Sequence, residues 1–79
     1  TTEDLFQQIA EHNKKDACNA LFRKWYERLC RFTGHYLDRK EDAEEVVSDV
    51  FVAIWHNRTS LEKVSKAETY LFVAVKNRL

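Results

Sequence analysis

Apolar side chains recur at three- and four-residue steps along most of the chain, the spacing that places residues on one face of an α-helix. We expect a first helix that is capped by Thr2, carries Glu3 and Asp4 in its first turn and ends near residues 13–14. Its apolar stripe consists of Leu5, Phe6 and Ile9.

A longer stripe follows and predicts a second helix, capped by Asp16 and continuing to about Leu37. Its apolar positions are Leu21, Phe22, Trp25, Tyr26, Leu29, Phe32 and Tyr36. The third stripe is the most regular and predicts a helix from Asp38 to Trp55. Steps of three and one place six residues on a single face: Ala43, Val46, Val47, Val50, Phe51 and Ile54.

Residues 56–64 carry polar turn formers and no helical stripe, so we expect a loop of about eight to ten residues there. Ser65 and Glu68 have the spacing of a capping box, which predicts a last helix over Ala67–Leu79. The predicted fold is therefore all-α, a small bundle of about four helices. The aromatic residues at helical spacing are expected in its core, namely Phe6, Phe22, Trp25, Tyr26, Phe32, Phe51, Trp55 and Phe72.

The composition supports a helical fold and excludes several classes of protein. The 79 residues include one Gly and no Pro, whereas hairpins, phosphate loops and dinucleotide-binding turns need these residues. A chain of this length forms one domain, over residues 1–79, with a core too small for most stand-alone catalysts. No apolar run approaches the about 20 residues of a membrane span, and no secretory signal opens the sequence. We expect a cytoplasmic domain that is an excerpt of a longer protein, because the chain lacks an initial Met and stops inside an apolar pattern at Leu79.

The residue types that bind metals or react covalently are isolated from one another. Cys18 and Cys30 lie twelve residues apart in one predicted helix, about 18 Å along its axis, and so cannot form a disulfide with each other. The three His residues have no second ligand at a zinc-binding spacing. The carboxylates of residues 41–49 lack a His or Lys that would complete a catalytic mechanism. We therefore predict no metal, no cofactor and no enzymatic activity.

Basic and acidic residues are equal in number over the whole sequence but are unevenly distributed along it. Residues 1–36 carry six basic and five acidic side chains, residues 37–55 two and six, and residues 56–79 five and two. The three segments thus have net charges of +1, −4 and +3. Adjacent acidic and basic surfaces are suited to one basic and one anionic partner, although both segments are also compatible with ordinary solvated faces.

Two motifs carry a resemblance to a known family. Residues 41–55 read EDAEEVVSDVFVAIW, and after the loop residues 67–78 read AETYLFVAVKNR. Together with YERLCRF at residues 26–32 they resemble region 2 of bacterial extracytoplasmic-function sigma factors, members of the sigma-70 family. The resemblance implies a helical domain of an alternative sigma factor that docks on the β′ clamp coiled coil of RNA polymerase. It also implies recognition and melting of the minus-ten promoter element through its non-template strand, an anti-sigma partner, and a separate region 4 helix-turn-helix domain absent from this chain.

Glu45, Ser48, Asp49 and Val52 follow the i, i+3, i+4, i+7 spacing and form a second face of the third predicted helix. This face is acidic at one end and apolar at the other, which suits it to lie along a helix that offers Arg and Lys. The resemblance implies that it contacts the polymerase clamp. Many members of the family carry Gln where this chain has Ser48.

The last predicted helix directs Leu71, Val75 and Leu79 toward the bundle and a mixed polar line the other way. That line and its neighbours offer cations for phosphates, an aromatic ring for an unstacked base and an amide for a base edge. The candidate DNA-binding residues are Arg58, Lys63, Ser65, Lys66, Tyr70, Lys76 and Asn77. By resemblance, residues 58–66 capture a flipped base. Val73 stands where many members of the family have Arg, and Tyr70 can equally belong to the core.

The leading hypothesis is thus an alternative sigma factor domain that binds the clamp and the opened minus-ten strand. The alternative is a helical protein–protein interaction module that does not touch nucleic acid, since the acidic third helix alone would allow it. A helix-turn-helix reader of duplex DNA is disfavoured, because no helix pair has the short Gly-containing turn of that motif.

Overall fold

The computed structural model describes all residues 1–79 and contains helices without strands. The four α-helices are α1 (Thr2–His12), α2 (Lys15–Gly34), α3 (Lys40–His56) and α4 (Ala67–Arg78), and a 3-10 helix, η1 (Arg58–Lys63), precedes α4. This architecture confirms the predicted all-α bundle.

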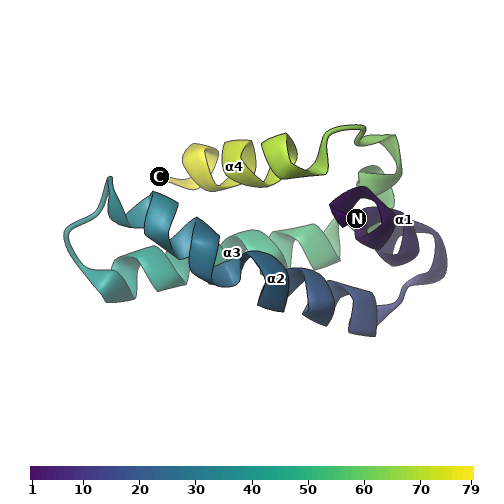
Figure 1. Cartoon of the computed structure of the whole chain (residues 1–79), viewed down its shortest axis with the longest axis horizontal. Helices are drawn as coiled ribbons and strands as arrows, with labels where there is room; N and C mark the ends of the chain where they lie inside the picture. Colours follow the sequence, from purple (N-terminus) through teal and green to yellow (C-terminus); the bar gives the residue numbers. More distant parts are fainter.

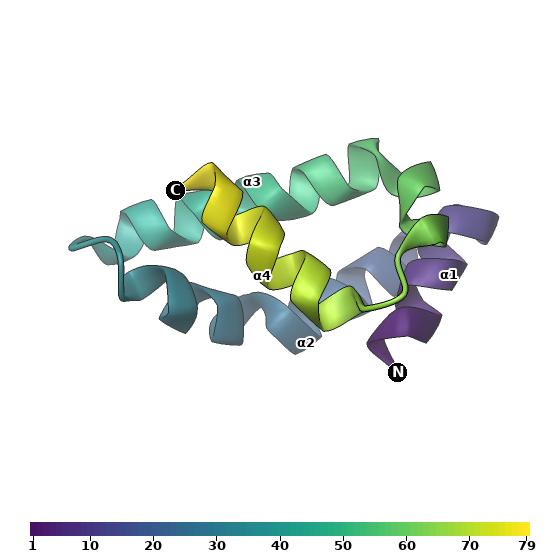
Figure 2. The same cartoon turned by 90° about the horizontal axis from the view of Figure 1, so that it is seen from above.

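Helices α2 and α3 form a long hairpin that sets the length of the molecule, and the other elements lie against it (Figure 1). Seen from above, α4 runs diagonally across the hairpin, while α1 and η1 pack together at the end away from the α2–α3 connection (Figure 2). The molecule is elongated, with extents of 37 × 21 × 21 Å.

The core lies where the hairpin, α1, η1 and α4 meet, and every one of these elements contributes to it. Its completely enclosed side chains include Ile9 of α1, Leu21 and Leu29 of α2, and Val47 of α3. The later elements supply Leu61, Leu71 and Val75. These positions follow the apolar stripes of the sequence, because a helix gains most from burying the side chains that share one face.

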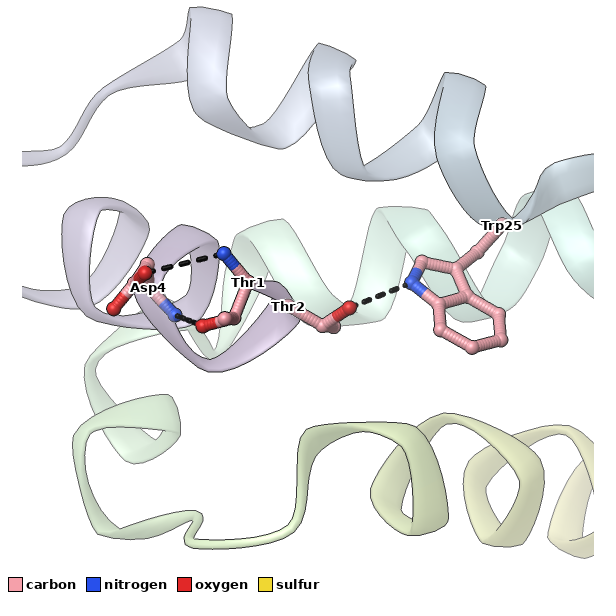
Figure 3. Close-up of polar contacts among 4 residues, drawn as sticks. All are labelled: Thr1, Thr2, Asp4 and Trp25. Atoms are coloured by element: carbon pink, nitrogen blue, oxygen red, sulfur yellow. Dashed lines mark hydrogen bonds and ion pairs between the residues drawn. The ribbon is translucent and has the colours of Figure 1, made fainter.

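The first helix begins one residue earlier than predicted. Thr1 is its N-cap and forms a capping box with Asp4, whose backbone N–H donates to the Thr1 hydroxyl at 3.2 Å. Thr2 is instead buried, and its hydroxyl accepts a 3.0 Å hydrogen bond from the indole Nε1 of Trp25 (Figure 3). The prediction of Thr2 as the cap was wrong because its hydroxyl satisfies a donor from another helix.

The predicted boundaries of α2 and α3 were also displaced. Lys14 is the N-cap of α2 and gives no side-chain bond, while Asp16 lies in the first turn, where its charge still favours the helix dipole. The helix ends at Gly34 rather than Leu37, and α3 begins at Lys40 rather than Asp38.

The segment between α3 and α4 departs most from the prediction. A loop was expected over residues 56–64, but residues 58–63 form η1, which is anchored by the fully buried Leu61. The expected capping box of Ser65 and Glu68 does not form. The N–H of Ala67 donates to the Glu3 carboxylate at 2.9 Å, and Glu68 lies 3.6 Å from the Arg28 guanidinium.

Candidate functional site

The acidic face of α3 lies outside the core, as its spacing predicted. Glu45, Asp49 and Val52 are exposed and Ser48 is half-buried. Val52 is 56% exposed, although it is an apolar side chain within a helix. The opposite stripe is buried, so this face is free to meet another molecule.

An apolar groove continues this face toward α2. It has a volume of about 410 Å³ and is lined by Lys15, Cys18, Asn19 and Phe22 from α2 and by Ser48, Phe51, Val52, Trp55 and His56 from α3. The groove thus places Ser48 and Val52 of the acidic face beside aromatic side chains of α2 and α3.

Phe22 was predicted to be a core residue, and this prediction was wrong. It is 36% exposed, stacks on Tyr26 with a centroid separation of 4.6 Å, and meets Phe51 edge-on at 5.1 Å. The apolar side chains of α2 occupy more of the helix surface than the neighbouring helices cover. Leu21 and Phe22 are adjacent in the sequence and therefore point to different parts of that surface. This pair of adjacent apolar residues was the signal in the sequence that one apolar side chain of α2 would lie outside the core.

A second groove runs along α4 and brings together four of the predicted DNA-binding residues. Ser65, Lys66, Tyr70 and Asn77 line a hollow of about 420 Å³. Its other lining residues, which the sequence did not indicate as a group, are Val64, Thr69, Val73 and Ala74. Val73 is 50% exposed in this groove. One surface therefore offers a cation, a hydroxyl, an aromatic ring and an amide.

Tyr70 both packs against the bundle and reaches its surface. The residue is half-buried, and its ring packs edge-on against Phe6 of α1 with a centroid separation of 5.6 Å. It also lines the α4 groove. Packing against α1 holds the ring in place, while its remaining surface forms the groove wall.

Arg58 lies apart from this groove. Its Nε donates to Asn13 Oδ1 at 2.7 Å and its Nη1 to the Trp55 carbonyl at 2.9 Å. The guanidinium lies over the Trp55 ring, 4.4 Å from the ring centroid. These contacts fix the start of η1 and use two of the five N–H donors of the guanidinium.

Three further cations, two of them predicted DNA-binding residues, stand at the surface in η1 and α4. Lys63 and Lys76 are exposed and do not line the groove, and Arg78 is exposed at the end of the helix. None of these three residues, nor Lys66, forms an ion pair within the chain. The four charges are therefore available to an anionic partner.

The start of α4 depends on Glu3, a residue that the sequence placed only in the first turn of α1. The bond from the Ala67 N–H lowers the pKa of the Glu3 carboxyl, with a smaller contribution from its own backbone N–H. The carboxylate is thus charged at neutral pH and lies at the positive end of the α4 dipole.

Other chemistry has no support in the structure. No group of three or more His, Cys, Asp or Glu side chains is placed to hold a metal ion. Cys18 and Cys30 are free thiols, and burial raises the pKa of each, so both are mainly protonated at neutral pH. None of the helices combines the length and the apolar character that crossing a bilayer requires.

In a comparison with known families, the model described as Sigma-70 region 2 matches residues 21–79, well over half of the chain. The match begins within α2, contains α3, η1 and α4, and leaves out α1. Comparison with curated proteins and with solved structures gives no match.

Proposed function

Because the chain belongs to the sigma-70 region 2 family, a non-enzymatic domain that serves sigma factors in promoter recognition and RNA polymerase binding, we propose a specific division of these tasks. The α3 face binds the coiled coil of the β′ clamp, and the α4 groove holds the opened non-template strand of the minus-ten element. The domain acts by binding alone, as part of an alternative sigma factor of the extracytoplasmic-function type.

The polymerase half of the proposal is supported by the exposed face of α3 and by the apolar groove beside it. Glu45 and Asp49 offer negative charge to Arg and Lys of a partner helix, while Val52 and Phe22 offer apolar surface. Charged groups at the edge of an interface guide association, and a buried aromatic anchor supplies most of the affinity. A helix that lies along α3 would reach both kinds of group.

The DNA half is carried by one observation, the convergence of Ser65, Lys66, Tyr70 and Asn77 on a single groove. Single-strand binding needs a stacking surface for an unpaired base and cations for the backbone. Tyr70 supplies the first, and Lys66 with the unpaired Lys63, Lys76 and Arg78 supplies the second. Asn77 has the donor and acceptor that can read a base edge.

The neutral net charge of the chain fits a domain that relies on a larger partner for its grip on DNA. Proteins that bind nucleic acid on their own gain most of their affinity by neutralising phosphates. We therefore expect weak binding to single strands in the absence of polymerase, with a shallow dependence on salt because few phosphates are neutralised. The same proposal places the domain in the cytoplasm, where polymerase is, and includes an anti-sigma factor as a regulatory partner.

The test titrates the isolated β′ clamp coiled coil into the chain and follows binding by calorimetry. Asp49→Arg places like charges together and is expected to weaken binding by a few kcal/mol, or more than tenfold. Asp38→Arg makes the same charge change at an exposed residue outside the α3 face and serves as the matched control. Binding that is absent in the wild type, or equal in the Asp49 variant, contradicts the polymerase half.

The DNA half is tested by adding a single-stranded oligonucleotide of mixed sequence and recording amide chemical shifts. Shifts confined to residues 64–77 support the groove, and no shift there contradicts it. Asn77→Ala should reduce discrimination among sequences more than overall affinity, whereas Gln8→Ala, the loss of an exposed amide on α1, should change neither.

A helical protein–protein module without nucleic-acid binding is the second candidate, and the apolar groove between α2 and α3 favours it. An exposed Phe22 beside Val52 is the kind of patch that a partner helix covers. Binding of a helical partner with no shift of the α4 groove on addition of single strands would favour this candidate.

A further inference from the structure

Three contacts tie the N-terminal part of the chain to the segment that forms the α4 groove. Asn13, directly after α1, accepts a hydrogen bond from Arg58 at the start of η1. Glu3 accepts one from the N–H of Ala67, the first residue of α4. Phe6 packs against Tyr70 one turn later. Helix α1 therefore spans the η1 segment and reaches both of its ends, as the adjacent positions of α1 and η1 in Figure 2 indicate.

Glu3 caps the start of α4, which the residues directly before the helix do not cap. Neither Lys66, the N-cap, nor any nearby side chain caps the helix. The first N–H groups of a helix have no partner within the helix, and a negative charge near them is favourable. The Glu3 carboxylate satisfies the N–H of Ala67 at 2.9 Å across 64 residues of sequence. It therefore acts as a cap from another part of the fold.

The capped turn is the one that carries the groove residues. Residues 67–70 form the first turn of α4, with Lys66 directly before it and Tyr70 at its end. Both residues line the groove. If this turn frays, the two side chains lose their fixed relation, even if the remainder of the bundle stays folded.

We propose that α1 sets the geometry of the DNA-binding groove and that Glu3 is the positioning residue through which it does so. This inference rests on the proposed function and deepens it, because α1 lies outside the residues that the family model matches. No hydrogen bond or ion pair joins α1 to α3. Loss of Glu3 should therefore weaken single-strand binding and leave binding of the clamp coiled coil unchanged.

The experiment compares Glu3→Ala, which removes the acceptor, with Glu3→Gln, which keeps a carbonyl oxygen at the same reach but loses the charge. Glu11→Ala is the matched control, because Glu11 is also exposed on α1 and its side chain forms no ion pair or hydrogen bond outside α1, its ion-pair partner being His12 at 3.9 Å. Each variant is titrated with a fluorescein-labelled single strand of mixed sequence and, separately, with the β′ clamp coiled coil. The Ala67 amide resonance reports whether the hydrogen bond is present.

The loss of a helix cap lowers the fraction of molecules with a formed first turn, and the apparent affinity falls by the same fraction. We expect Glu3→Ala to raise the Kd for the single strand about three- to tenfold, Glu3→Gln to recover part of this loss, and Glu11→Ala to match the wild type. The affinity for the coiled coil should stay within about twofold in all variants.

Four outcomes would overturn the proposal. The first three leave the proposed function standing, whereas the fourth also contradicts its DNA half. Unchanged single-strand binding in Glu3→Ala, with a shifted Ala67 resonance, shows that the bond does not matter to the groove. Equal losses for DNA and for the coiled coil show general destabilisation, and a Gln variant as weak as the Ala variant shows that the acceptor is not what matters. If the wild type binds no single strand, the DNA half of the proposed function fails as well.

Discussion

The buried hydrogen bond between Thr2 and Trp25 gives the sharpest test of how the ends of this bundle are held together. The Trp25 side chain is almost completely enclosed, and its Nε1 has the Thr2 hydroxyl as its partner at 3.0 Å (Figure 3). Thr2→Val keeps the shape and the β-branch of the side chain but removes the acceptor. The indole N–H, which can only donate, then remains buried without a partner.

The expected cost follows from that unsatisfied donor. A buried polar group without a hydrogen bond costs about 1–3 kcal/mol, and a domain of this size has a free energy of unfolding of about 4–12 kcal/mol at about 0.05–0.15 kcal/mol per residue. Each kcal/mol lowers the Tm of a small domain by about 4–8 °C. Thr2→Val should therefore lower the Tm by about 4–24 °C.

Thr2→Ser is the matched control, because it keeps the hydroxyl and loses only one methyl group, worth about 0.8 kcal/mol. Circular dichroism during heating gives the Tm, and urea titration gives the free energy of unfolding. The reasoning is refuted if Thr2→Val unfolds within about 0.3 kcal/mol of the wild type, or if the Ser variant is the less stable of the two.

Three further predictions concern η1 and the start of α4. Leu61→Ala removes the fully buried anchor of η1 and should lower the free energy of unfolding by about 2–5 kcal/mol in urea titration; a loss below about 0.5 kcal/mol would mean that η1 is not anchored by this residue. Arg58→Gln removes the charge together with the paired bonds to Asn13 and the Trp55 carbonyl, so stability should fall by about 1 kcal/mol while the salt dependence of single-strand binding stays the same. A salt slope reduced by about one would instead identify Arg58 as a phosphate contact. In the fold, the pKa of Glu3 lies below its ordinary value of 4.5. The contribution of Glu3 to stability is therefore present above that value and is lost as the pH falls through the folded pKa. The urea midpoint should fall with pH in that acid range, and the midpoint of Glu3→Gln should fall less steeply.

The periodicity of the sequence determined the helices and the direction in which each one faces. The stripe from Ala43 to Ile54 predicted the buried side of α3, and the acidic line of Glu45 and Asp49 predicted its exposed side. Both follow from local geometry, since residues three and four apart share a helix face whatever surrounds the helix. The grouping of Ser65, Lys66, Tyr70 and Asn77 around one groove has the same origin, because all four residues lie on or directly before α4.

The tertiary structure decided the features that depend on residues far apart in the sequence. A capping box of Ser65 and Glu68 is a sound local expectation, but the Glu3 carboxylate takes the Ala67 N–H across the bundle. Arg58 looked like a free cation, yet Asn13 and Trp55 hold it. The local sequence shows which donors and acceptors exist, whereas only the tertiary structure determines which of them form hydrogen bonds with one another. The exposure of Phe22 has the same cause, because the number of partners that cover a helix is a property of the bundle and not of the helix.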